Sequence, residues 1–365
     1  MRRRTAAAML ALSLGVACRD TRPYVVGVVL ASEGEQGARL ALKHVNASGG
    51  VRGRAMEARN FSGAYNSGAR VALQVAESLS RDTRVVAVIG HTNSSASLAA
   101  AQVYNEQHVA QIAPTTTAPL YSQAGPYSFR LVASDEHQAR FIADQVMARA
   151  GARIAIVYVN DDYGRALHMM LGGELSQRKV RPVYEGSYVE DDTANGAAEL
   201  IGSIAAARPT TLVWLGRASE FRRIATRLRA ALPRVEVIAS DGFGGSAVES
   251  DSGGLFDRVR YVRLVDVDRA DTTLQRVRGE YEKLGRGDLS DQAALAYDAV
   301  LLVAQAIREV GPDRERIRDW LARLGTDHPA YPGITGPLSF QRLGDRAPSY
   351  VLVTPGARRP AGVAH

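Results

Sequence analysis

Cysteine is almost absent from this sequence, since Cys18 is the only one among 365 residues. A single thiol cannot form an intrachain disulfide, so disulfide scaffolds are excluded. Aromatic residues are also few, at 6%, and after the first residues no basic run alternates with them. We therefore attribute the net charge of +7 to an arginine-rich surface and expect no nucleic-acid partner. With 46% hydrophobic and 23% charged residues, the composition is that of a globular protein.

Long hydrophobic runs are missing too, and no stretch after the N-terminus predicts a transmembrane helix. Residues 5–17 are apolar but too short to span a bilayer stably, and they follow three arginines. This pattern is typical of an export signal. Small residues precede Cys18, which resembles a bacterial lipoprotein signal, although Leu14 lies one place earlier than usual. We predict that residues 1–18 are a lipoprotein-like signal peptide. The protein would then be exported to the periplasm or cell envelope and lipid-anchored at Cys18, with ordinary secretion as the alternative.

Motifs for catalysis are not found either. No HExxH, P-loop or GxSxG pattern is present, and the seven histidines lack the spacing of metal ligands. One pattern, GFGGSA at residues 242–247, has the spacing of a dinucleotide-binding turn, with Asp266 at the end of a later predicted strand. However, DSGG at residues 251–254 interrupts the helix that such a site needs. We expect no cofactor, no metal and no catalysed reaction, and keep a dinucleotide-dependent enzyme only as an alternative.

Short apolar runs alternate with helical patterns along most of the chain, which predicts parallel sheets with crossover helices. The pattern restarts after residue 132, so we expect two α/β lobes in tandem, with a ligand cleft between them. Strands are predicted at residues 25–31, 56–61, 85–89, 110–113, 153–159, 180–189, 211–215, 235–240, 260–267, 336–340 and 349–353. Helices are predicted at residues 35–47, 67–80, 96–107, 136–150, 165–178, 193–207, 219–231, 274–284, 291–310 and 314–324.

Residues 85–119 form the segment around which the first lobe is organised. Two apolar runs end there in polar turns, one containing Ser94 and Ser95 and the other containing Thr115 and Thr117. Because the carboxyl ends of parallel strands lie on the same edge of a sheet, both turns are expected to meet there. The serines also stand at a predicted helix start, where free N–H groups and the helix dipole favour an anion. The segment therefore predicts a site for a small carboxylate.

Six short motifs follow one another in a specific order. Together they resemble the periplasmic binding proteins of the leucine/isoleucine/valine type over about residues 24–354. The motifs are VNASGGVRG at residues 45–53, VIGH at 88–91 with the two serines after it, APTTTAP at 113–119, DDYG at 161–164, AYDAV at 296–300 and GPLSF at 336–340.

The resemblance implies an α/β fold with two Rossmann-like lobes, each with a parallel sheet. The lobes are joined by a three-strand hinge and close on a ligand. The implied crossovers lie near residues 132–135, 265–268 and 334–344. Lobe 1 would then contain residues 24–132 and 266–335, and lobe 2 residues 133–265 and 336–354. Residues 355–365 are expected to be a frayed tail.

The resemblance also implies roles for individual residues. Ser94 and Thr117 match positions that hold the α-carboxylate of a ligand, and Thr115 matches one whose carbonyl accepts from the α-ammonium. Tyr163 matches an aromatic residue that covers the ligand. Asp241 aligns with an acidic residue that pairs with the ammonium.

Two departures from the family pattern put the ligand's side chain in question. The segment at residues 32–37, expected to be a loop after the first strand, is shorter than usual by about a dozen residues, and in the family that loop shapes the side-chain pocket. Arg217 stands where binders of aliphatic amino acids often have an aromatic residue. Both departures favour a polar or acidic ligand over an aliphatic one, with Arg217 as a further ligand contact.

We therefore predict a solute-binding protein, not an enzyme. It would bind an amino acid or related carboxylate by closure of its lobes and deliver it to an ABC-type permease in the membrane. A ligand-sensing receptor subunit for a signalling partner is the alternative, since the sequence does not distinguish the two.

Overall fold

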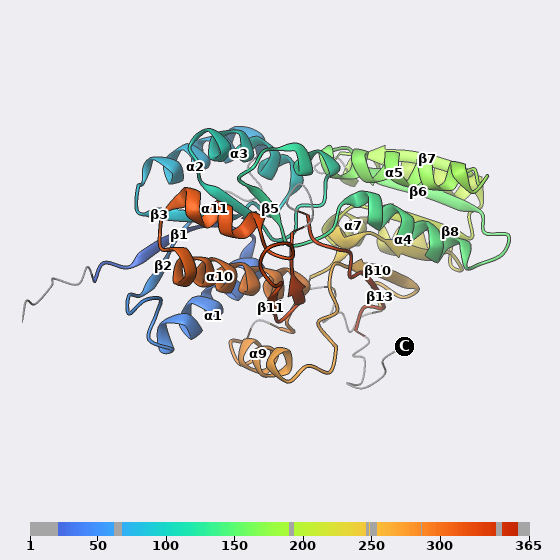
Figure 1. Ribbon diagram of the computed structural model, residues 1–365. Helices are drawn as coiled ribbons and strands as arrows, with labels where there is room; N and C mark the ends of the chain where they lie inside the picture. Colours follow the sequence, from blue (N-terminus) through green and yellow to red (C-terminus); the bar gives the residue numbers. More distant parts are fainter. Residues whose placement is uncertain are drawn as a thin grey trace, which may run out of the picture.

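The structure, a computed structural model, describes residues 21–61, 68–189, 193–245, 248, 254–285, 287–340 and 345–356. It consists of two α/β lobes side by side (Figure 1). This confirms the predicted fold class. Each lobe has its own sheet, with helices on both faces.

The first lobe contains a five-stranded parallel sheet in the order β2-β1-β3-β4-β5. Its buried central strands are rich in valine and isoleucine, as expected when helices cover both faces of a sheet. Figure 1 shows α2 and α3 above the sheet and α1 and α10 below it. The strands are β1 (Tyr24–Val29), β2 (Met56–Asn60), β3 (Val85–Gly90), β4 (Ala110–Ala113) and β5 (Ser128–Arg130). The helices are α1 (Ser32–Ala47), α2 (Gly68–Arg81), α3 (Ser94–Glu106), α9 (Thr272–Glu282), α10 (Asp291–Val310) and α11 (Arg314–Ala322), with a 3-10 turn, η2 (Pro119–Gln123).

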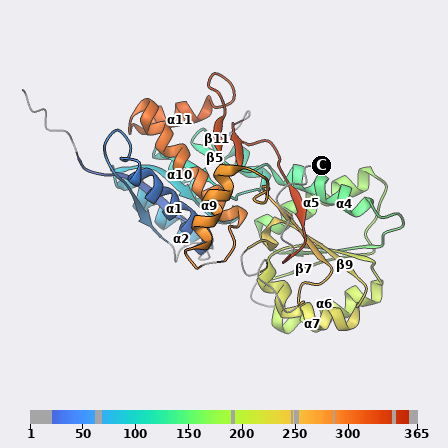
Figure 2. The same ribbon diagram turned by 90° about the horizontal axis from the view of Figure 1, so that it is seen from below.

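The second lobe contains a six-stranded sheet in the order β13-β10-β9-β8-β6-β7, in which only β13 is antiparallel. Helices α4 and α5 cover one face, and α6 and α7 cover the other (Figure 2). The strands are β6 (Ile154–Val159), β7 (Tyr184–Tyr188), β8 (Thr211–Leu215), β9 (Glu236–Ala239), β10 (Val259–Arg263) and β13 (Val351–Val353). The helices are α4 (Asp135–Met147), α5 (Asp162–Gln177), α6 (Thr193–Ala207) and α7 (Ala218–Ala231), with a 3-10 turn, η3 (Asp241–Phe243). A separate hairpin pairs β11 (Tyr331–Gly333) with β12 (Gly336–Leu338).

The structure corrects one prediction that concerned the ligand pocket. Residues 32–37 are the first turns of α1 and not a loop. Glu33 and Glu35 lie in the first turn, where the helix dipole favours acidic side chains, so the helix can begin at Ser32 without an apolar pattern. Only Ala31, just before this helix, reaches the cavity described below.

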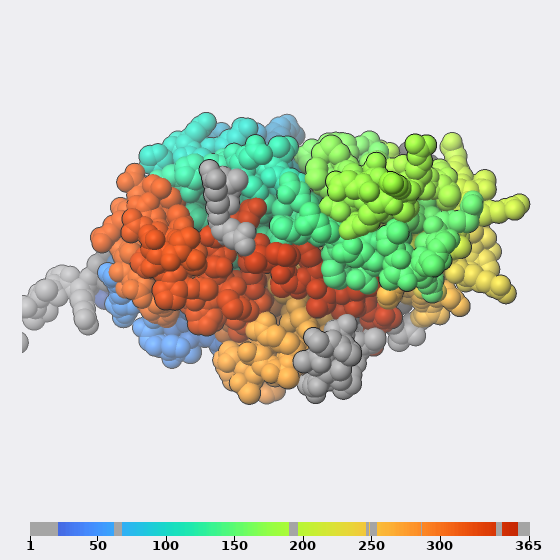
Figure 3. Space-filling view, turned by 45° about the vertical axis from the view of Figure 1, so that its right-hand side comes forward, coloured from blue at the N-terminus to red at the C-terminus, as the bar shows by residue number. Residues whose placement is uncertain are grey.

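The chain passes from one lobe to the other three times. It leaves the first-lobe sheet after β5 and enters α4, returns from β10 to α9, and crosses again between β12 and β13. Figure 3 shows the C-terminal segments, in red, across the junction of the lobes. Residues 341–344 of the third predicted crossover lie outside the described residues. The lobe boundaries predicted from the sequence remain our proposal for the position of the hinge.

Buried charged side chains connect the crossover segments. Arg346 Nη1 of the third crossover donates to Leu131 O of the first at 3.2 Å and to Thr335 Oγ1 at 2.9 Å. Arg130 Nε and Nη2 each lie 2.7 Å from one carboxylate oxygen of Asp345. These bonds link the first and third crossover segments, close to where the lobes meet.

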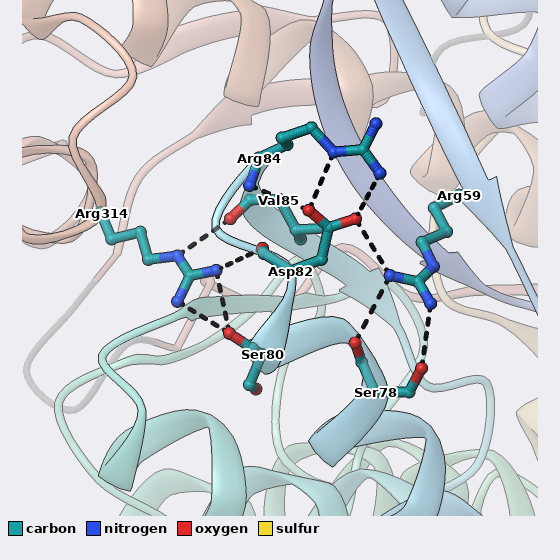
Figure 4. A network of polar contacts seen from close by, with 7 residues as sticks. All are labelled: Arg59, Ser78, Ser80, Asp82, Arg84, Val85 and Arg314. Carbon is teal, nitrogen blue, oxygen red and sulfur yellow. Dashed lines mark hydrogen bonds and ion pairs between the residues drawn. The ribbon is translucent and has the colours of Figure 1, made fainter.

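A second polar network holds the loop that leads into β3 (Figure 4). Arg314 of α11 donates to the carbonyls of Ser80, Asp82 and Val85 at 2.9–3.2 Å. Hydrogen bonds from the Arg84 guanidinium, with help from Arg59, lower the pKa of Asp82 to about 2. The start of β3 is thereby fixed at the edge of the sheet opposite to the cavity described below.

Among the described residues, no helix is long and apolar enough to cross a bilayer. The same residues contain no group of His, Cys, Asp or Glu side chains placed to hold a metal ion. The predicted signal peptide with Cys18 lies outside the described residues, as do residues 357–365 of the predicted tail. Pro355 and Gly356, where that tail begins, form a turn.

Candidate functional site

A cavity of about 230 Å³ lies between the two lobes, at the carboxyl ends of their parallel strands. The sheet edges face each other there, so the turn residues of both lobes line the same space. The first lobe contributes Ala31, Thr92, Asn93, Ser94, Thr115, Asp291 and Gln292. The second lobe and its crossover contribute Tyr163, Arg217, Ser219, Asp241, Gly242 and Leu264.

The first-lobe wall is built around the start of α3. Asn93 caps this helix, because its Oδ1 accepts from Ala96 N at 2.8 Å. Thr115 Oγ1 donates to Thr92 O at 2.8 Å, which joins the turns after β3 and β4. Ser94, the first residue of α3, lines the cavity next to these turns. A helix start beside hydroxyl groups is suited to an anion.

The structure places two predicted contact residues away from this wall. Ser95 is half-buried on α3 and does not line the cavity. Thr117 is buried behind it, where its carbonyl accepts from Asp135 N at 2.9 Å and from Arg130 Nη1 at 3.0 Å. Their contact with a ligand stays a prediction. The other five, Ser94, Thr115, Tyr163, Arg217 and Asp241, do line the cavity.

The carboxylate of Asp241 lines the second-lobe wall and is held by two donors. Tyr163 Oη lies 2.6 Å from Asp241 Oδ1, and Gln138 Nε2 donates to the same oxygen at 2.8 Å. Tyr163 Oη is also 2.8 Å from Ser240 Oγ. Because a phenol has one proton, it donates to the carboxylate and accepts from the serine hydroxyl. The orientation of Asp241 is therefore set by the protein itself.

A second buried carboxyl group, Asp135, lies behind this network. Gln138 Nε2 donates to Asp135 Oδ1 at 3.0 Å as well as to Asp241, so one amide bridges two carboxyl groups. Burial raises the pKa of both carboxyls, and the charge of Asp241 raises that of Asp135 further. A cation placed beside Asp241 would offset this repulsion.

Arg217, also from the second lobe, forms an ion pair. Its Nη2 lies 2.8 Å from Asp161 Oδ2, and both side chains are about a quarter exposed. Trp214 Nε1 donates to Arg217 O at 3.2 Å, which fixes the backbone at the start of α7. The arginine therefore reaches the cavity together with a neutralising carboxylate.

His91 lies beside the cavity but does not line it. The ring is fully buried, and its Nε2 is 3.3 Å from Tyr104 Oη. Burial lowers the pKa of His91 to about 3, so the ring is neutral at physiological pH. His91 is therefore part of the buried interior of the first lobe and not of the cavity wall.

Sequence reasoning missed Asp135, Gln138 and Asp291. Each lies at or near a helix start, where an acidic or amide residue is common for local reasons alone. Asp135 and Gln138 are three residues apart on one helix, a spacing that puts them on the same face. Only their approach to Asp241, more than a hundred residues away, distinguishes them from ordinary helix-start residues.

The pH dependence of stability should reveal the buried Asp291. Burial raises its pKa to about 6 from 3.8, and Asp241 adds to the rise. The folded protein then keeps a proton that the unfolded chain has lost, so the contribution of Asp291 to stability falls as pH rises from about 4 to about 6. Across pH 5–7, the Asp291→Asn variant should gain about 1.4 kcal/mol relative to the wild type in urea unfolding. If the free energy of unfolding of the two proteins changes with pH in the same way, this prediction is wrong. The titration of His91 does not affect the comparison, because both proteins contain it.

Comparisons with known proteins agree with this geometry. A family model described as "Receptor family ligand binding region" matches residues 34–356. The sequence is 26% identical over 326 residues to the Leu/Ile/Val-binding protein homolog 1 of Brucella abortus, covering 87% of this chain and 84% of that protein. Among solved structures, a leucine binding protein from Thermotoga maritima is similar at a TM-score of 0.80 and 19% identity, over 91% of this chain and 96% of that one. The branched-chain amino acid transporter substrate binding protein of Streptococcus pneumoniae, in complex with isoleucine, has a TM-score of 0.79 and 22% identity over the same shares.

Proposed function

The chain belongs to the receptor family ligand binding region, and from this membership we propose that it is an exported solute-binding protein for an amino acid. It captures the ligand between its lobes and delivers it to an ABC-type permease. The resemblance to leucine/isoleucine/valine-type binding proteins is confirmed by the family match and by the curated relative. Because those relatives bind solutes, we assign binding and no catalysed reaction.

One observation carries this proposal: the two walls of the cavity favour ligand groups of opposite charge. The first-lobe wall presents the start of α3 and the hydroxyls beside it, and the second-lobe wall presents the carboxylate of Asp241. An α-amino acid is a zwitterion whose two charged groups lie close together, so it can satisfy both walls at once. A charge-assisted hydrogen bond contributes roughly 1.5–3 kcal/mol, so a few of them give micromolar affinity.

We assign the roles as follows. Ser94 and the N–H groups at the start of α3 hold the α-carboxylate, and Thr115 presents its carbonyl to the α-ammonium. Asp241 is the counter-ion of that ammonium, and Tyr163 orients Asp241 and covers the ligand. Ser95 and Thr117 complete the carboxylate site if the turns rearrange as the lobes close.

The mechanism follows from the position of the cavity. Ligand groups that touch both lobes are fully bound only when the lobes are close together. The ligand therefore shifts the population toward the closed form by its differential affinity for that form. The permease would recognise the closed form, and the three crossovers are the segments that bend.

A lipid anchor at Cys18 is part of the proposal. Cleavage before Cys18 and acylation of its thiol would keep the protein at the membrane that holds the permease. Cell fractionation tests this, because Cys18→Ala should move the protein from the membrane fraction to the soluble one. If the distribution of this variant is the same as that of the wild type, the anchor is wrong.

A thermal-shift panel tests the proposed function. At roughly 1 mM of an amino acid with micromolar affinity, the protein should gain about 4 kcal/mol of stability. For a chain of 365 residues this corresponds to a rise in Tm of about 5 °C. The best ligand is then compared with the same carboxylate lacking its amine. Equal shifts would remove the ammonium role of Asp241, and no shift with any amino acid would refute the function.

A further inference from the structure

Three charged side chains line the cavity, and their positive and negative charges do not cancel. Arg217 contributes a positive charge, but its ion pair with Asp161 neutralises it. Glu220, buried in the first turn of the helix that Arg217 caps, adds another carboxylate nearby. The remaining two charges, Asp241 and Asp291, are both negative and come from different lobes. The cavity therefore has an excess of negative charge.

The carboxylate of Asp291, like that of Asp241, is held in place by hydrogen bonds from the protein. Its Oδ2 accepts from Leu264 N at 3.0 Å, and its Oδ1 accepts from Gln292 N at 2.9 Å. The side chain is 3% exposed and stands at the start of α10. Backbone donors thus orient the carboxylate at the cavity wall without removing its charge.

Neither acid has a counter-ion in the described part of the chain. No described cationic group lies within 4.0 Å of Asp241 or Asp291. The positive charge of Arg263 acts on Asp291 from a distance. Arg263 itself forms an ion pair with Asp268, with its Nη1 2.6 Å from Asp268 Oδ2. A buried carboxylate without a counter-ion is costly, so two of them across one cavity predict two positive charges on the ligand.

We propose that the ligand is a dibasic amino acid, with a second amino or guanidinium group on its side chain that pairs with Asp291. The inference rests on the proposed function, in which Asp241 holds the α-ammonium and the start of α3 holds the α-carboxylate. It narrows the expectation of a polar or acidic side chain to a polar, basic one, since Arg217, one of the two departures behind that expectation, is paired with Asp161. A glutamate-like ligand would meet Asp291 with a like charge, and an aliphatic one would leave Asp291 buried without a counter-ion.

The test compares ligands that differ in one charge. Isothermal titration of the mature protein measures arginine against citrulline, its uncharged near-isostere, and lysine against norleucine. We expect the charged member of at least one pair to bind about 100-fold tighter, because a site built for a polar group strongly rejects an analogue without it. In Asp291→Asn the ratio should fall to less than about 5-fold, since the amide carries no charge.

A matched control is available on the surface. Asp327→Asn makes the same chemical change at a side chain that is 74% exposed and whose nearest contact with Arg323 is long, at 3.9 Å. This variant should leave the ratio of charged to uncharged ligand affinity unchanged. Equal or tighter binding of norleucine, citrulline or glutamate would overturn the inference while leaving the proposed function intact. If no amino acid binds, the proposed function itself fails. Should Asp291→Asn not fold, the ligand ratios of the wild-type protein alone decide.

Discussion

Asp241→Asn should weaken amino acid binding by about 100-fold, because truncating one partner of a buried charge pair costs at least 2–5 kcal/mol. Tyr163 and Gln138 both donate to Asp241 Oδ1, so an asparagine can keep both bonds through its carbonyl oxygen. The substitution therefore removes the charge opposite the ligand's ammonium and leaves the network in place. Titration calorimetry at neutral pH with the best amino acid of the panel measures the effect.

The stability of the ligand-free variant separates this role from a structural one. Burial raises the pKa of Asp241, and its charge raises that of Asp135. Removing one of the two carboxylates relieves their repulsion, so the Tm without ligand should stay the same or increase. Weaker binding together with a lower Tm would point to a damaged fold. Unchanged affinity would show that Asp241 does not pair with the ammonium.

Asp345→Ala should reduce the free energy of unfolding by about 3–5 kcal/mol, the usual effect of removing one partner from a buried ion pair. Arg130 is fully buried, and its Nε and Nη2 each lie 2.7 Å from an Asp345 oxygen. Without Asp345 its positive charge would be buried with only neutral acceptors. Urea unfolding followed by circular dichroism measures the change.

The surface pair of Arg318 and Asp319 gives the control for this experiment. These side chains are 30% and 51% exposed, and Asp319→Ala should change stability by less than about 1 kcal/mol. A similar small effect for Asp345→Ala would mean that water replaces the lost carboxylate. The crossover pair also reaches the cavity wall, since Arg130 Nη1 holds the carbonyl of Ala118, whose N–H donates to Ser94 Oγ at 3.4 Å.

The long periodic elements could be predicted from the sequence, and the irregular ones could not. Helices α6 and α10 and strand β8 have the bounds that their apolar patterns indicate. The start of α1 was missed because residues 32–37 contain two glycines and no apolar stripe. The structure explains Gly37, since a Cβ there would clash with the carbonyl oxygen of Ala293 on α10. A close helix–helix contact overrode local propensity, and a single sequence does not show that contact.

Two further elements were missed for similar reasons. Strand β5 has three residues with only one apolar side chain, which is too short for an alternating pattern, and β11 has a proline at its centre. Both form because a neighbouring strand is already in place. Short strands of this kind depend on tertiary context.

For the site, the motifs located the turns but not their electrostatics. Parallel topology placed Ser94 and Thr115 at one sheet edge, and the family resemblance added Tyr163, Arg217 and Asp241. All five line the cavity. The ion pair of Arg217 with Asp161, and the charge of Asp291, depend on side-chain geometry between segments far apart in the sequence. The sequence therefore predicted which turns meet at the cavity, and that they bind a carboxylate stays a prediction. The balance of charge around the cavity came only from the structure.

The packing of α1 against α10 has a consequence for biosynthesis. The core of the first lobe combines β1 and α1 with α10 and α11, which are separated from them by more than two hundred residues. During translation, the α1 side of the first-lobe sheet cannot be fully buried until nearly the whole chain has been synthesised, whereas the α2 and α3 side is buried by residues 25–109. Strands β6 to β10 are contiguous and can pair earlier, although β13 is added last. A ribosome-bound chain that stops before α10 would expose the apolar side of α1, which makes it a substrate for chaperones that hold unfolded chains.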